Sequence, residues 1–152
     1  MTPRIIDRAT VARILCVLAA AHAGACGSDA DTPTSPTTTT PTVASPTVTE
    51  EFVGTVPVGG ASFYSFTVEQ NGTVNITLTA IGGAGVPGTA WMGVGIGVPS
   101  GEECPATSTI NTPPGTTAQL TGTYAPGVYC TRVADIGNLI APATVAVTIA
   151  HP

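Results

Sequence analysis

The sequence predicts an all-β protein whose folded part is a single antiparallel β-sandwich of about seven strands. Beyond residue 50, short runs of alternating apolar and polar residues are separated by Gly, Pro and Asn-Gly turns. This pattern is typical of half-buried strands. All seven aromatic residues lie beyond residue 50, and no segment there repeats its apolar residues with helical spacing over eight or more residues. A stretch of about 100 residues is enough for one small domain with one core.

Residues 1–25 have the composition of a secretory signal peptide. Arg4, Arg8 and Arg13 precede an apolar run of eight residues, 14–21, and small residues follow. A basic start, a short apolar stretch and a small-residue cleavage site are the parts of such a signal. The run is too short to span a bilayer as a helix, which needs about 20 residues. We therefore expect residues 1–25 to direct export and to be removed.

The residues around Cys26 resemble the lipobox of bacterial lipoproteins, with the order Ala23-Gly24-Ala25-Cys26. The resemblance implies that cleavage leaves Cys26 first in the chain and that its thiol carries a diacylglycerol. The protein would then be anchored to a bacterial membrane at the cell envelope. The alternative is ordinary cleavage near Ala23 or Ala25, which would release a secreted, soluble protein.

Residues 26–49 are predicted to be a disordered, Thr/Pro-rich tether that follows the lipid-anchor cysteine. Residues 32–49 contain nine Thr, four Pro and two Ser. This composition offers no apolar surface that would offset the entropy cost of ordering the chain. Regularly spaced Pro favours extended polyproline II structure, at about 3.1 Å per residue. The tether would hold the β-sandwich domain, residues 50–152, away from the anchoring surface.

Seven strands can be placed in order along the domain. Residues 52–56 open it, and a Gly-Gly turn leads to residues 62–68. Asn71-Gly72 is the strongest short signal of a hairpin, and it leads to residues 73–79. The remaining strands are expected at residues 92–98, 117–123, 127–134 and 144–150.

Alternation assigns an inner face to each strand. The residues expected to face the core on the second, third and fourth strands are Tyr64, Phe66, Val68, Val74, Ile76, Leu78, Met92, Val94, Ile96 and Val98. The other face of the fourth strand consists of Gly93, Gly95 and Gly97. We expect that face to be bare toward solvent or covered by an aromatic side chain. The alternative is that a ligand approaches the flat glycine surface.

The cysteines predict one disulfide inside the domain. Cys16 leaves with the signal, so Cys104 and Cys130 are the pair that remains beyond Cys26. Outside the cytoplasm such a pair tends to close. The bond would pin a long loop around Cys104 to the strand that contains Cys130. Metal binding is not expected, because a metal site needs more soft ligands than these two.

Charge and composition exclude several classes of function. Only 9% of the residues are charged, against about 25% in average soluble domains. The chain has four Arg and no Lys, so no nucleic-acid partner is expected. Residues 83–88 match the GxGxxG pattern, but no helix follows them to bind a dinucleotide. His151 lies one residue from the end and is a poor catalytic base, so we expect neither an enzyme nor a cofactor.

Three segments resemble the bacterial pre-peptidase C-terminal domain and related lipoprotein β-sandwiches. They are GTVPVGGASFYSFTV, NGTVNITLTA and APGVYCTRVAD, and the resemblance covers about residues 51–150. Members of that family are small accessory β-sandwich domains on secreted proteins, often beside peptidases. The resemblance therefore implies an accessory domain, and it provides no catalytic residue for this sequence.

These features predict a non-catalytic exported lipoprotein that presents a small β-sandwich binding or scaffolding domain at the cell envelope. One alternative is a carbohydrate-binding module, for which Trp91, Tyr124 and Phe63 are the candidate sugar-stacking residues. If all three are buried, that alternative loses its basis. The other alternative is an accessory domain associated with secreted enzymes. The expected partners are a membrane, through the lipid anchor, and an extracellular protein or glycan.

Overall fold

A computed structural model describes residues 42–152 of the chain. The predicted signal peptide, the lipidation of Cys26 and most of the predicted tether lie outside the described residues. β structure begins before residue 50. The backbone N–H of Ala44 donates to the Asn71 carbonyl, and Thr47 N–H donates to the His151 carbonyl. The last residues assigned to the tether thus pair with the domain.

The described residues form eight strands, and the predicted all-β fold is confirmed. The strands are β1 (Val48–Val56), β2 (Ala61–Val68), β3 (Gly72–Gly82), β4 (Met92–Gly97), β5 (Ala106–Thr112), β6 (Leu120–Tyr124), β7 (Gly127–Ala134) and β8 (Ala143–His151). Within the described residues, no helix has the length and apolar character needed to cross a membrane.

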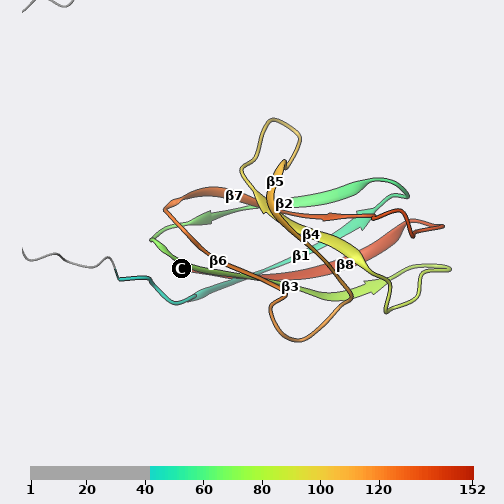
Figure 1. Cartoon of the computed structure of the whole chain (residues 1–152), viewed down its shortest axis with the longest axis horizontal. Coiled ribbons are helices and arrows are strands. Elements are labelled where there is room, and N and C mark those ends of the chain that lie inside the picture. The colour runs from blue at the N-terminus through green and yellow to red at the C-terminus, as the bar shows by residue number, and fades with distance from the viewer. Residues whose placement is uncertain (1–41) are drawn as a thin grey trace, which may run out of the picture. The chain divides into compact units, whose positions relative to one another are not determined.

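The strands form two four-stranded antiparallel sheets (Figure 1), with the orders β1-β8-β3-β6 and β2-β7-β4-β5. We call them the first and the second sheet. Every strand pair in both sheets is antiparallel. The β1–β2, β3–β4 and β7–β8 connections lie together at one end of the sandwich, on the right in Figure 1.

The core lies between the sheets and is built by the predicted alternation. Leu78 on β3, Met92 on β4 and Val147 on β8 are almost fully buried, as are most of their inward-facing neighbours. The faces predicted for the second and third strands are confirmed, with Tyr64 packing at the margin of the core. The predicted inward position of Val98 is wrong. β4 ends at Gly97, and the Val98 side chain is 56% exposed.

The structure contains one strand that the sequence did not predict and shifts another. Residues 106–112 were expected to be loop but form β5, an edge strand that pairs only with β4. β6 begins at Leu120 rather than 117. The side chain of Gln119 pairs with the backbone of β3 instead, accepting from Leu78 N–H at 2.8 Å and donating to the Leu78 carbonyl at 3.2 Å.

Candidate functional site

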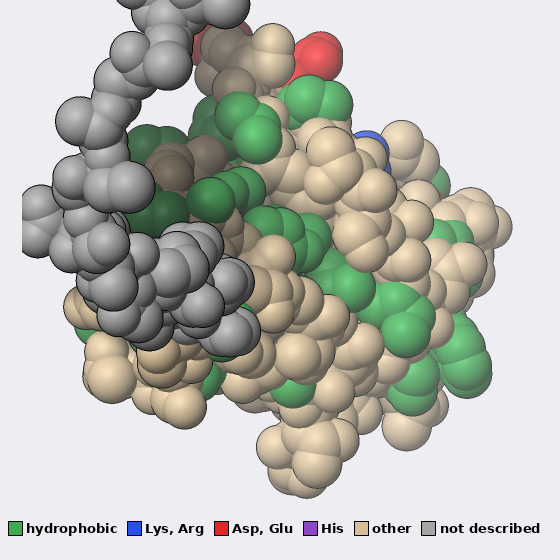
Figure 2. Space-filling view, turned by 60° about the vertical axis from the view of Figure 1, so that its left-hand side comes forward, with side chains coloured by type: hydrophobic (Ala, Val, Ile, Leu, Met, Phe, Trp, Pro, Cys, Tyr) green, Lys and Arg blue, Asp and Glu red, His purple; other side chains and the backbone are tan. Residues whose placement is uncertain are grey.

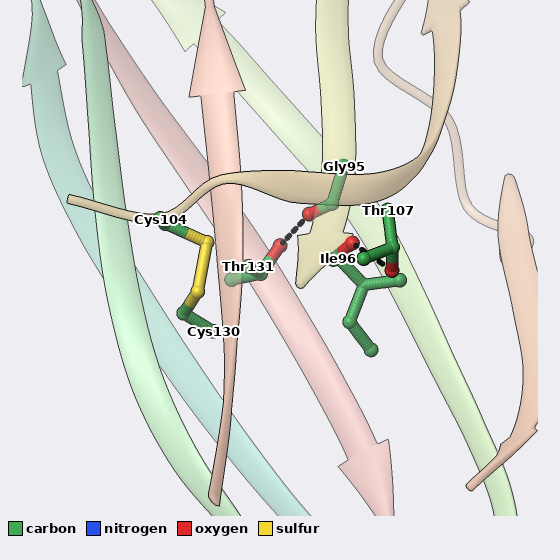
Figure 3. The surroundings of a disulfide bond; sticks show 6 residues. All are labelled: Gly95, Ile96, Cys104, Thr107, Cys130 and Thr131. Atoms are coloured by element: carbon green, nitrogen blue, oxygen red, sulfur yellow. Dashed lines mark hydrogen bonds between the residues drawn. A yellow bond between two sulfur atoms is a disulfide. The ribbon is translucent and has the colours of Figure 1, made fainter. Parts of the chain in front are cut away.

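The predicted disulfide between Cys104 and Cys130 is present, and both residues are buried (Figure 3). Cys130 points to the outer face of β7, since its neighbours Tyr129 and Thr131 point inward. Cys104 lies two residues before β5, and its Cα is 6.0 Å from that of Cys130. The bond therefore fastens the connection between β4 and β5 onto the outer face of the second sheet.

The glycine face of β4 is covered in part by the chain itself. A Cβ on Gly95 would lie 2.8 Å from the Cβ of Ala106 and 3.1 Å from the Ser108 carbonyl oxygen. A Cβ on Gly97 would collide with the Pro105 carbonyl. Figure 3 shows β5 crossing over Gly95. The prediction of a face that is bare or covered by an aromatic ring is therefore wrong at Gly97, where backbone packs, whereas at Gly95 residues 106–109 cover only part of the face.

Gly97→Ala tests this close approach. Because the added methyl meets backbone rather than a movable side chain, we expect the free energy of unfolding to fall by about 1–3 kcal/mol, the usual cost of overpacking. The matched control is Gly82→Ala at the end of β3, where a new Cβ meets nothing within 4 Å. Urea unfolding followed by tryptophan fluorescence compares the two variants. Equal stabilities of the two variants would contradict the packing described here.

One row of residues crosses the outer face of the second sheet in register. Arg132 on β7 lies between two register partners, Phe63 on β2 and Gly95 on β4. Gly95 in turn pairs with Thr109 on β5. Because Gly95 has no side chain, nothing from β4 stands beside Arg132 on this face. The row thus places an aromatic ring and a guanidinium next to each other.

Two hollows lie on this face, one on each side of Arg132. The larger has a volume of about 410 Å³ and is lined by Ala61, Phe63, Glu102, Glu103, Cys104, Pro105, Ala106 and Arg132. The smaller has about 230 Å³ and is lined by Gly93, Gly95, Ala106, Thr109, Asn111, Arg132, Ala134, Asp135 and Ile136. Arg132 and Ala106 line both hollows. We call the two hollows together the Arg132 groove.

Arg132 is the one positively charged residue between residues 42 and 152, where six carboxylates occur. Its side chain is partly buried. In that part of the chain the one close contact between a basic and an acidic side chain joins His151 to Glu50, and no hydrogen bond involves the guanidinium. Charged side chains are few on the face in Figure 2, where hydrophobic residues form a band. A partly buried guanidinium without an ionic partner is ready to receive an anionic group.

Asp135, at the edge of the smaller hollow, has its charge satisfied by the backbone. Its carboxylate accepts from the N–H groups of Gly59 at 2.8 Å, Gly137 at 2.8 Å, Asn138 at 3.0 Å and Leu139 at 3.2 Å. These bonds, that from Gly59 above all, hold the pKa of Asp135 below its usual range. Asp135 thus fixes the β7–β8 connection against the β1–β2 turn.

The three predicted aromatic candidates are not gathered in one place. Phe63 is 37% exposed and lines the larger hollow. Trp91 is 52% exposed just before β4, and it lines neither hollow. Tyr124 is half-buried at the end of β6 in the first sheet, with its ring 5.1 Å from that of Tyr129. Only Phe63 therefore belongs to the Arg132 groove.

A partly buried polar cluster that the sequence did not predict joins the two sheets. Glu50 on β1 accepts from the Tyr64 hydroxyl on β2 at 2.5 Å and lies 2.9 Å from His151 Nε2 on β8. His151 is 3% exposed and packs on the Phe66 ring. The bond from Tyr64, ahead of that with His151, holds the pKa of Glu50 below its usual range, and the same bond raises the pKa of Tyr64. The cluster fastens β1 and β8 to β2.

Acid should weaken this cluster. Since the folded-state pKa of Glu50 lies below that of the unfolded chain, its stabilising contribution is complete above about pH 4.3 and is lost as the pH falls through the folded-state pKa. Glu50→Gln should therefore flatten the dependence of the unfolding midpoint on pH between about pH 2 and 5. Glu51→Gln, whose side chain is exposed on the same strand, is the control. A Glu50→Gln profile parallel to that of the wild type would contradict this role.

The fold and the groove define a β-sandwich with a hollowed, arginine-centred sheet face. No family model and no curated protein matches the chain. Among solved structures it is similar to the crystal structure of Aeromonas hydrophila PliG, a periplasmic lysozyme inhibitor of g-type lysozyme. The identity is 14%, the match covers 67% of this chain and 84% of that chain, and the TM-score is 0.46. The proposals below therefore rest on this chain's own residues.

Proposed function

We propose that the protein is a non-catalytic, exported binding domain whose ligand site is the Arg132 groove. The observation that carries the proposal is a partly buried guanidinium without an ionic partner in the described residues, set between two hollows of about 410 and 230 Å³. Small-ligand sites are concave and have a few well-placed polar groups. The disulfide keeps one wall of the larger hollow in place.

Two features support export in this proposal. Disulfides persist in oxidising compartments and are rare in the cytoplasm, and Cys104 is bonded to Cys130. The sequence of residues 1–25 fits a secretory signal. A lipid anchor on Cys26 and a Thr/Pro-rich tether would present the domain at the surface of a bacterial membrane.

The non-catalytic assignment rests on where the acid–base groups lie. His151, the one histidine in the described residues, is buried and held by Glu50. Neither residue lines the Arg132 groove. Of the carboxylates that do line it, Glu102 and Glu103 are adjacent, exposed side chains on one loop, and Asp135 is held by four backbone N–H groups. A general base has to reach the proton it removes. The groove therefore brings together groups that bind and orient a ligand.

The resemblance to the pre-peptidase C-terminal domain family suggests a second role for the same groove, that of an accessory domain. An accessory domain that binds a ligand near a secreted enzyme would use the same groove. The exposure of Phe63 within the groove favours a glycan over a protein as that ligand, because a small hollow with one aromatic wall suits a sugar ring.

A pair of matched variants tests the groove as the binding site. Thr109→Trp places a bulky side chain in the smaller hollow, and Thr123→Trp places the same side chain on an exposed position of β6 in the first sheet. The purified full chain is sedimented with the host's envelope fraction after that fraction has been freed of lipid. We expect Thr109→Trp to lose sedimentation and Thr123→Trp to keep it. The proposal would be contradicted if both variants still sedimented with the envelope fraction, or if only Thr123→Trp failed to do so.

The anchor is tested separately. Mass spectrometry of the protein from membrane fractions should show a chain that begins at Cys26 and carries lipid on that residue. Cys26→Ser should move the protein into the soluble fraction. A wild-type chain with an unmodified N-terminus beyond residue 26 in the soluble fraction would contradict the lipid anchor and support ordinary cleavage.

A further inference from the structure

We infer that the Arg132 groove recognises an acidic saccharide, with a sugar carboxylate on the Arg132 guanidinium and the sugar ring against Phe63. The inference rests on the proposed function and specifies its ligand. Phe63 and Arg132 are register partners on neighbouring strands, and both line the larger hollow. A guanidinium and a carboxylate form paired, charge-assisted hydrogen bonds. The apolar face of a sugar ring packs on an aromatic side chain beside that ion pair.

The charges around the groove favour a carboxylate over a more highly charged anion. Glu102 and Glu103 line the same hollow as Arg132, and the segment from residue 42 to 152 carries a net charge of −5 with His151 neutral. One guanidinium balances one negative charge. The second charge of a phosphate group would face the two carboxylates without a partner. The same carboxylates can instead accept hydrogen bonds from sugar hydroxyls.

The shape of the groove fits more than one sugar unit. The larger hollow, at about 410 Å³, lies within the range of about 300–1,000 Å³ for small-ligand sites. Arg132 and Ala106 line both hollows, so a ligand can continue from one hollow into the other. Thr109 and Asn111 in the smaller hollow offer a hydroxyl and an amide to further sugar hydroxyls. A short oligosaccharide with one uronic acid residue among neutral sugars satisfies all of these groups.

Calorimetric titration of the purified full chain tests the inference with two matched probes, a trisaccharide that contains a single galacturonic acid residue and the neutral methyl ester of the same trisaccharide. We expect the acid to bind and the ester to bind at least about tenfold more weakly, the usual effect of losing a hydrogen bond to a charged group. Arg132→Gln should lose binding of the acid by a similar factor, and Arg132→Lys should retain part of it. Phe63→Leu should weaken binding by about two- to tenfold through the lost ring contact. Trp91→Ala, outside the groove, should bind as the wild type does.

Three outcomes would overturn the inference: no binding of the acid, equal binding of acid and ester, or unchanged binding by Arg132→Gln. Binding of inorganic phosphate, or of an acidic peptide in place of the trisaccharide, would also overturn it. Melting temperatures of all variants show whether each is folded. The Thr109→Trp and Thr123→Trp comparison does not depend on the ligand's identity. A groove that binds envelope material but no uronic acid would therefore refute the saccharide and leave the proposed function standing.

Discussion

Cys130→Ala should lower the free energy of unfolding by roughly 3–4 kcal/mol, because the disulfide closes a loop with a sequence separation of 26 residues. The loss is large against the total stability of a small domain, which is typically about 5–15 kcal/mol. For a domain of this size the melting temperature should fall by about 10–20 °C. Differential scanning calorimetry of the wild type and the variant measures the change.

The control for this prediction removes both sulfurs. Cys104→Ala combined with Cys130→Ala should be about as unstable as either single variant, since the bond is lost once in all three. Binding should weaken along with stability, because the wall of the larger hollow formed by residues 102–106 is no longer fastened to β7. A Cys130→Ala protein with the same melting temperature as the wild type would show that the disulfide adds no stability.

Leu78→Ala should cost about 3–5 kcal/mol, the range measured when a fully buried leucine leaves a cavity that cannot collapse. Leu78 is fully buried on β3, opposite Val147 of β8 in the first sheet. The backbone of Leu78 is held by β8 on one side and by the Gln119 side chain on the other, so it has little freedom to relax.

Val53→Ala is the matched control for Leu78→Ala. Val53 lies on the edge strand β1 and is 68% exposed, so its truncation should change the unfolding free energy by no more than about 0.5 kcal/mol. Urea unfolding curves of the two variants give the comparison. Similar losses at both positions would contradict the two-sheet core.

The core could be predicted because alternation directly encodes which side chains are buried. For this reason the inward-facing residues of the strands at residues 62–68 and 73–79 were predicted correctly. β5 could not be read in this way, since residues 107–111 are all exposed and show no apolar period. Backbone pairing with β4 and the disulfide beside its first residue hold β5 in place. Neither leaves a local pattern in the sequence.

The candidate site was predicted only in part. The glycines of β4 and Phe63 were singled out, and the cysteine pair was correct. Arg132 was not singled out, although a lone cation on the same face as Cys130 was a usable signal. The alternation of apolar and polar residues does not predict the register between strands, and it is this register that places Arg132 between Phe63 and Gly95. The contact of Glu50 with His151, 101 positions apart, depends on the same long-range pairing.

The central claim, that the Arg132 groove is the ligand site, is tested most directly by NMR of the isotope-labelled full chain. Amide signals are followed while a soluble digest of envelope polysaccharide is added. The largest shifts are expected at Phe63, Ala106, Asn111 and Arg132, which line the two hollows. Shifts confined to β1 and β6 of the first sheet, or to the connections that contain Trp91 and Ile140, would contradict it.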